Sequence, residues 1–204
     1  MRIVSTVVLA LVLSIGWTTS AHSQLSDVDR SHTEGLFFNA HLNAQGISVE
    51  DEDGEGGLGG GLKVGYGFTP LFTLYGGVDV ASMDVETALD PAITQDSYTL
   101  AHVDIGGQLN FRVGPNATVP YLDGSLTGFA AVYSTDPDIS LSGIGGSVGG
   151  GIKYFFSPQF AFDGGLHFTI GQYDELEVGS TTTDVDLSVV TARINVGLAW
   201  YPFR

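Results

Sequence analysis

The chain has 204 residues, and its 23 acidic against 7 basic side chains give a formal net charge of -16 at pH 7. This charge argues against a nucleic-acid partner, because phosphate contacts depend on Lys and Arg side chains. Cysteine is absent, which excludes disulfides, thiolate metal ligands and a cysteine nucleophile. A chain of this length forms one domain or at most two.

Residues 1–23 have the pattern of a secretion signal. A short basic start precedes a mostly apolar stretch over residues 3–17, and Ala21-His22-Ser23 fits a small-x-small cleavage pattern. The apolar stretch is shorter than the ~20 residues that a membrane-spanning helix needs, which favours a cleaved leader over an anchor. We therefore expect the mature chain to begin at Gln24, with residues 24–34 as a polar periplasmic lead-in.

Beyond the lead-in, apolar and polar residues alternate with a period of two, which predicts strands with one apolar and one polar face. No convincing helical pattern follows the leader. The predicted fold is all-β, an eight-stranded antiparallel up-and-down barrel over residues 35–204. The expected strands, in chain order, are 35–45, 58–68, 72–80, 99–113, 119–133, 144–156, 160–170 and 187–200.

One stretch occurs nearly twice: residues 149–168 repeat the glycines, the lysine, the aromatic-proline turn and the apolar run of residues 59–80. Duplication of a four-strand half explains this echo. Two hairpins of one barrel that came to look alike explain it equally well.

The two faces of the strands decide between two kinds of barrel. An apolar interior would make a soluble ligand carrier, whereas an apolar exterior makes a transmembrane barrel. The polar face holds equal numbers of acids and bases, which suits an enclosed lumen. The aromatic residues lie near the short turns, as in the aromatic girdle of a membrane barrel. We therefore predict a transmembrane barrel, with Lys153 opposite Asp163 and Asp79 one diagonal step from Lys63. The expected lumen network, structural in role, is Lys63, Asp79, Asp104, Arg112, Asp123, Lys153, Asp163 and Arg193.

The connections between strands are of two kinds, and their lengths predict two different rims. Short acid-free turns are expected at 69–70, 114–118 and 157–158, and long acidic loops at 50–57, 82–97, 134–140 and 171–186. Short turns belong on the periplasmic side of outer-membrane barrels, so the acidic loops are expected outside the cell. Clustered carboxylates in such loops are the oxygen ligands that Ca²⁺ and Mg²⁺ prefer. A solvated loop of like charges that binds no ion is the alternative interpretation of the same residues. The first such loop contains Glu50, Asp51, Glu52, Asp53 and Glu55.

No motif in the chain indicates catalysis or a cofactor. The glycine run lacks the Gly-Lys-Ser/Thr of a phosphate loop. His41, His102 and His167 have neither the serine and acid neighbours of a hydrolase nor metal-site spacing. We expect no cofactor, no metal centre and no enzymatic activity, and an interior that eight strands leave wide enough only for side chains.

The leader, the eight strands, and the stretches "GYGFTP", "KYFFSP" and "INVGLAW" resemble the small bacterial outer-membrane barrels of OmpA/OmpX/opacity-protein type. The resemblance implies a Gram-negative outer membrane, with lipid and lipopolysaccharide around the barrel and a structural or interaction role in the envelope. A porin-like diffusion channel and an outer-membrane lipid-modifying enzyme are the alternatives. Such barrels usually finish on an outward aromatic residue, whereas here Trp200 is followed by Tyr201-Pro202-Phe203-Arg204.

Overall fold

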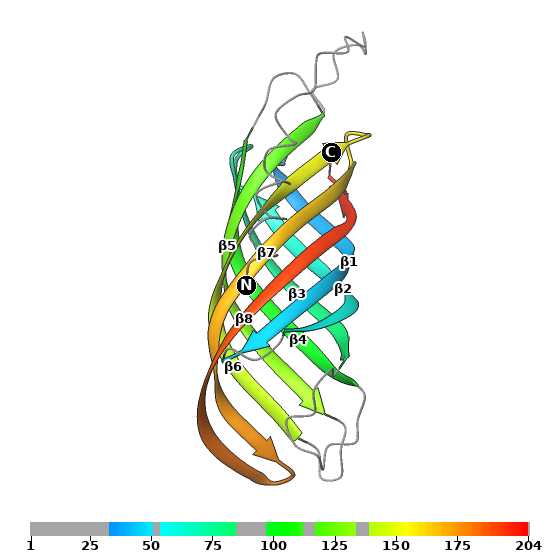
Figure 1. Ribbon diagram of the computed structural model, residues 1–204. Coiled ribbons are helices and arrows are strands. Elements are labelled where there is room, and N and C mark those ends of the chain that lie inside the picture. Colours follow the sequence, from blue (N-terminus) through cyan, green and yellow to red (C-terminus); the bar gives the residue numbers. More distant parts are fainter. Residues whose placement is uncertain (1–32, 51–53, 85–96, 112–116, 134–138, 204) are drawn as a thin grey trace, which may run out of the picture.

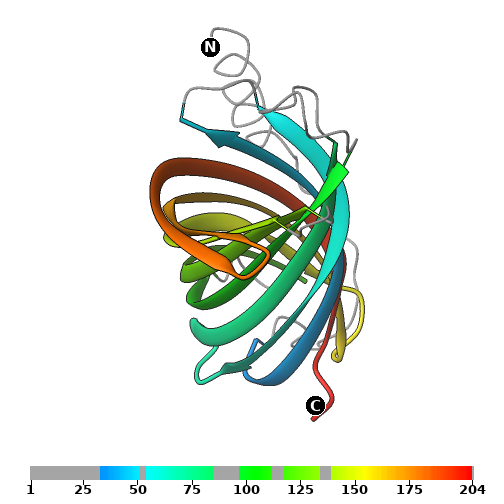
Figure 2. The same cartoon turned by 90° about the horizontal axis from the view of Figure 1, so that it is seen from below.

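Antiparallel strands linked in chain order close into a barrel, because β1 pairs with both β2 and β8. The computed structural model describes residues 33–50, 54–84, 97–111, 117–133 and 139–203, and Figures 1 and 2 show the barrel from the side and from below. The predicted fold class is confirmed, while the predicted leader (1–23) and most of the lead-in (24–34) lie outside the described residues. The strands are β1 (Gly35–Val49), β2 (Glu55–Gly67), β3 (Phe72–Asp84), β4 (Ser97–Asn110), β5 (Thr118–Tyr133), β6 (Ile139–Phe155), β7 (Phe160–Val178) and β8 (Thr181–Trp200).

The period-two pattern places apolar side chains outside and polar side chains inside. Leu126 on the outer face is 77% exposed, whereas Arg193 on the inner face is 2% exposed. A continuous exposed apolar band of this kind is suited to lipid and would be an aggregation hazard in water. Within the described residues no helix is long and apolar enough to cross a membrane.

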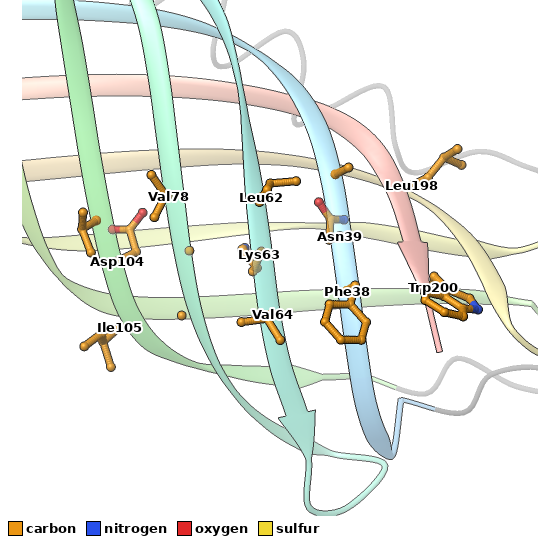
Figure 3. Close-up of a pocket in the computed structure, with 14 residues that line it drawn as sticks. Phe38, Asn39, Leu62, Lys63, Val64, Val78, Asp104, Ile105, Leu198 and Trp200 are labelled. Atoms are coloured by element: carbon orange, nitrogen blue, oxygen red, sulfur yellow. The ribbon is translucent and has the colours of Figure 1, made fainter. Parts of the chain in front are cut away.

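The outer face is not uniformly smooth. An apolar groove of about 640 Å³ crosses β8, β1, β2, β3 and β4. Figure 3 shows Phe38, Leu62 and Val64 in this groove, together with Trp200 of β8. The groove is part of the lipid-facing band, since its outward side chains are apolar.

The two short turns explain the sequence echo. In the turn at 68–71, Thr69 Oγ1 accepts hydrogen bonds from the amides of Leu71 (3.3 Å) and Phe72 (3.0 Å). In the turn at 156–159, Ser157 Oγ accepts the equivalent bonds from the amides of Gln159 (3.3 Å) and Phe160 (3.0 Å). A hydroxyl that satisfies two amides is a local device for reversing a chain. The repeated aromatic-hydroxyl-proline sequence therefore encodes one turn used twice.

The prediction of a long acidic loop over residues 171–186 is wrong. β7 runs on to Val178 and β8 starts at Thr181, so these residues form a hairpin that projects beyond the ends of β1 and β2 (orange in Figure 1). Gly179 has φ of +60°, the left-handed conformation that a two-residue hairpin turn requires. A bulge lies between Tyr173 and Glu175, where the register with β6 shifts. The acidic side chains thus lie on strands, and only Gly179 and Ser180 connect them.

Candidate functional site: a sealed polar lumen and an acidic rim

Arg193 is the centre of the lumen network and reaches across the barrel from β8. Its Nη1 donates to Asp104 Oδ2 at 2.7 Å and to Asp79 Oδ2 at 3.0 Å, and its Nη2 donates to Asp104 Oδ1 at 3.3 Å. All three side chains are buried. One guanidinium therefore links β8 to β3 and β4 through charge-assisted hydrogen bonds, which are the stronger kind.

The two carboxylates that meet Arg193 have further partners. His41 Nε2 lies 2.5 Å from Asp79 Oδ1, and Asn43 Nδ2 donates to the same oxygen at 2.8 Å. Thr127 Oγ1 donates to Asp104 Oδ1 at 2.5 Å. The polar groups of these three further strand positions thus satisfy charges that burial would otherwise destabilise.

A second cluster surrounds Asp123 and Asp163. His167 Nε2 lies 3.0 Å from Asp123 Oδ2, and Lys63 Nζ lies 3.8 Å from the same oxygen. Asp163 accepts hydrogen bonds from Asn39 Nδ2 and Tyr121 Oη, both at 2.9 Å. A cavity of about 10 Å³ lies among these side chains, about the minimum that holds one water molecule.

The predicted register is confirmed, but the two predicted ion pairs are not formed. Lys153 pairs with Asp163 between β6 and β7, and Asp79 lies one diagonal step from Lys63. Within the described residues, however, the ion pair of Lys63 is with Asp123. In a lumen this narrow, a long side chain reaches across the ring as easily as to the neighbouring strand.

Lys153 lies among aromatic rings instead. Its Nζ donates to Tyr201 Oη at 3.4 Å and lies 4.8 Å from the ring centre of Phe37 and 5.3 Å from that of Tyr121. Its side chain is buried. A desolvated ammonium over ring faces is stabilised by cation–π attraction.

Two apolar layers close the lumen on either side of the polar network. Near the short turns, Tyr201 packs on Phe37 at 5.7 Å and on Phe155 at 5.4 Å between ring centroids. Near the projecting hairpin, Phe129 meets Tyr173 edge-on at 5.1 Å. The short-turn plug comprises Phe37, Tyr75, Val119, Phe155, Ala161, Ala199 and Tyr201. The hairpin-side plug comprises Ile47, Ala81, Met83, Tyr98, Leu100, Phe129, Ala131, Tyr173 and Val189.

The rim beyond the hairpin-side plug is acidic, and we call it the acidic rim. Glu50 is exposed there, and Glu55 Oε2 accepts a hydrogen bond from Tyr98 Oη at 2.7 Å. Of the predicted site residues, Asp51, Glu52, Asp53 and Arg112 lie outside the described residues. The acidic side chains of this rim that the structure describes are Glu50, Glu55, Asp84, Asp174, Glu175, Glu177, Asp184 and Asp186.

The histidines take part in the lumen network. His41 contacts Asn39 and Asp79, His167 contacts Asp123 and Asn195, and His102 lies 3.5 Å from Thr191 Oγ1. Among the residues the structure describes, no three His, Asp or Glu side chains are grouped for a metal ion, and no serine hydroxyl hydrogen bonds to a histidine. The arrangement holds buried charges in place, and the hydroxyl beside His102, that of Thr191, is itself buried.

A family model described as outer membrane protein beta-barrel domain matches residues 8–201. The chain belongs to this outer-membrane β-barrel family. Solved barrels resemble it in fold. Neisserial surface protein A is 18% identical with a TM-score of 0.61, over 82% of this chain and 97% of that chain. No curated protein matches the sequence.

Two further solved barrels have the same fold. OprG of Pseudomonas aeruginosa is 14% identical with a TM-score of 0.55, over 85% of this chain and 98% of that chain. Ail, the attachment invasion locus protein of Yersinia pestis, is 15% identical with a TM-score of 0.52, over 82% and 100%. At these identities the likeness concerns the fold alone. Family membership places the barrel in the outer membrane. Its role has to be argued from its own residues.

Proposed function

We propose that this outer-membrane barrel is a non-enzymatic envelope protein that does not conduct and that interacts through its acidic rim. The carrying observation is the filled lumen, where a polar network lies between two apolar plugs. The interior therefore supports the fold, and the rim is the surface left for recognition. The leader over residues 1–23 is part of the proposal, and N-terminal sequencing of the protein from outer membranes should begin at Gln24.

Conductance across a planar bilayer tests the filled lumen. The barrel should give no stable single-channel steps, because Arg193 and both plugs occupy the path. The variant Tyr201→Ala, which removes one ring of the short-turn plug, should also stay silent, since the hairpin-side plug remains. Large, stable steps from the unaltered barrel would refute the proposal and favour the porin-like channel.

The charge of the acidic rim indicates cationic rather than anionic partners. Ail has been solved in complex with the heparin analogue sucrose octasulfate, which is a polyanion. A rim rich in carboxylates repels such a ligand. Divalent cations held among lipopolysaccharide headgroups can instead bridge to these carboxylates, because oxygen ligands are what Ca²⁺ and Mg²⁺ prefer.

Thermal unfolding in lipopolysaccharide-containing bilayers tests the cation bridge. Millimolar Ca²⁺ or Mg²⁺ should raise the unfolding temperature more than NaCl of equal ionic strength, and neutralising Glu50, Asp51, Glu52, Asp53 and Glu55 should shrink the difference. Glu34→Gln, next to β1 at the short-turn end, is the matched control. It should leave the difference between the divalent ions and NaCl unchanged. Equal effects of NaCl and the divalent ions would contradict the bridge.

Protease accessibility tests the orientation of the rim. Protease added to intact cells should cut the β7–β8 hairpin near Gly179 and spare the short turn at 68–71, since short turns face the periplasm in such barrels. The reverse pattern of cleavage would show that the orientation is wrong.

A further inference from the structure

Among the described residues, one edge of the projecting β7–β8 hairpin has no partner strand, and we call it the free edge. β1 pairs with β8 as far as Val49 opposite Val189, and the last bond that the described residues make here is from the amide of Glu50 to Ser188 O at 3.0 Å. Glu50 has φ of +52°, a left-handed conformation that ends the extended run of β1. Residues 181–187 of β8 continue past this point with no backbone partner on that side among the described residues.

The opposite side of the hairpin is paired on both sides of the bulge, and the register skips Asp174 of β7 and Val185 and Asp186 of β8, so the edge belongs to an extended sheet with one irregularity. β7 pairs with β6 up to Val178 opposite Ile139, and β8 pairs with β7 down to Thr181. Val185 and Leu187 pack against the hairpin-side plug. Figure 2, the view from below, shows this hairpin in brown and orange at the left of the ring. An edge held in an extended form is a template for another strand.

The charge at this edge has no counter-ion in the hairpin. Asp184 lies directly opposite Glu175 in the β7–β8 register, and like charges at opposed positions destabilise a strand pair. Asp186 accepts a hydrogen bond from the neutral Gln172, at 2.7 Å. The sequence has no Lys or Arg from residue 171 to residue 192. A cation brought to this edge would relieve the repulsion.

We propose that residues 181–187 of β8 bind an extended cationic polypeptide segment by strand addition. The proposal rests on the proposed function in one respect, namely that the acidic rim faces the outside of the cell. Backbone groups of the edge supply the hydrogen bonds, and the carboxylates of Asp184 and Asp186 select basic side chains. A second copy of the chain is the poorer occupant, because pairing of this edge with itself would bring its own carboxylates together.

Thr182 is the position that tests the edge without damaging the hairpin. Val178 and Thr181 close the turn as a pair, so the amide of the next residue, Thr182, points away from β7. Proline at this position removes an edge donor and no bond to β7. Thr182→Pro is therefore the test variant. Thr182→Val keeps the amide and serves as the matched control.

The probe is a fluorescent peptide of alternating Lys and Val, and binding to the detergent-solubilised barrel is followed by anisotropy at physiological salt. Thr182→Pro and the double change Asp184→Asn/Asp186→Asn should each weaken binding about tenfold. Thr182→Val should bind like the unaltered barrel. Heat-modifiable gel migration verifies that each variant is folded, and the aspartate variant tests the site even where the proline variant does not fold.

Two further arms separate the possible failures. A peptide of the same charge with proline in place of valine cannot add as a strand. If it binds equally well, strand addition is wrong while the acidic rim of the proposed function stands. If the unaltered barrel sediments as a dimer that Thr182→Pro abolishes, the occupant is a second copy and the cationic partner is refuted. If no cationic peptide binds, both the edge site and cationic recognition by the rim fail.

Discussion

Removal of Arg193 tests the lumen network most directly, because one side chain holds two carboxylates. In the variant Arg193→Met, Asp79 keeps its contacts with His41 and Asn43, whereas Asp104 keeps, among the described residues, the hydroxyls of Ser125 and Thr127. The uncompensated charge is therefore mainly that of Asp104. Breaking a buried pair from one side costs about 3–5 kcal/mol, and we expect a loss of this size in the free energy of unfolding.

The second change, Asp104→Asn, removes the charge that Arg193→Met leaves unpaired. The amide oxygen of asparagine can still accept from Thr127, so only one ordinary hydrogen-bond set is altered. We expect the double variant Arg193→Met/Asp104→Asn to be about 2 kcal/mol more stable than Arg193→Met alone. This sign is the opposite of what two independent losses would give, since independent destabilisations add.

Urea unfolding in lipid vesicles, followed by tryptophan fluorescence, measures both variants. Trp200 is the only tryptophan after residue 23, and it lies on the lipid-facing surface. Its emission therefore reports directly on the loss of membrane contact. A double variant that is as unstable as the single variant, or less stable, would refute the view that Arg193 stabilises the barrel by neutralising Asp104.

Three further predictions concern packing. In the same urea assay, Gly61→Val should lower the free energy of unfolding by about 1–3 kcal/mol, because a Cβ there meets the Asp79 carboxylate and the His41 ring. The control Gly146→Val should change the free energy of unfolding by less than about 0.5 kcal/mol, because a Cβ at Gly146 meets open space. In that assay Tyr201→Ala should lower the free energy of unfolding by about 3–5 kcal/mol, because the ring fills the short-turn plug. Tyr201→Phe should lower it by about 1 kcal/mol, because it removes the hydroxyl contact with Lys153 and keeps the ring. Equal losses from the two variants would contradict this. Gly179→Val should speed proteolysis of the hairpin without changing barrel unfolding, because a β-branched residue is strained at φ of +60°, and unchanged cleavage would argue against a rigid turn.

The strands and their facing follow from local pattern, so the sequence was sufficient to predict them. Alternation over each strand decides which side chains enter the lumen, and the short turn at 156–159 determines the register between β6 and β7. The pairing of ions inside was not predictable by that reasoning. Arg193 and Asp79 are far apart along the chain, and their contact depends on how side chains cross the closed ring.

Two other features were missed for identifiable reasons. The acidic composition of residues 171–186 favours a loop, whereas Thr181, Thr182 and Thr183 are β-branched residues of the kind that favour strands. Tyr201 departs from the usual barrel ending, which is an outward aromatic residue. Its parity gave the better signal, since the residue after the outward Trp200 must point inward, where Tyr201 is 1% exposed.

The charges inside the barrel also explain how strands with an apolar outer face find one register. Each strand from β2 to β8 directs one charged side chain into the lumen, and β1 directs Asn39, His41 and Asn43 there. A slip of one residue would turn that side chain into the lipid. For a Lys or Arg this costs about 2–4 kcal/mol at the bilayer midplane, so each basic residue penalises the wrong register by itself. In the correct register, pairing across the ring and, for Lys153, the facing aromatic rings offset the cost of burying the charges. In strand order these residues are Lys63, Asp79, Asp104, Asp123, Lys153, Asp163 and Arg193.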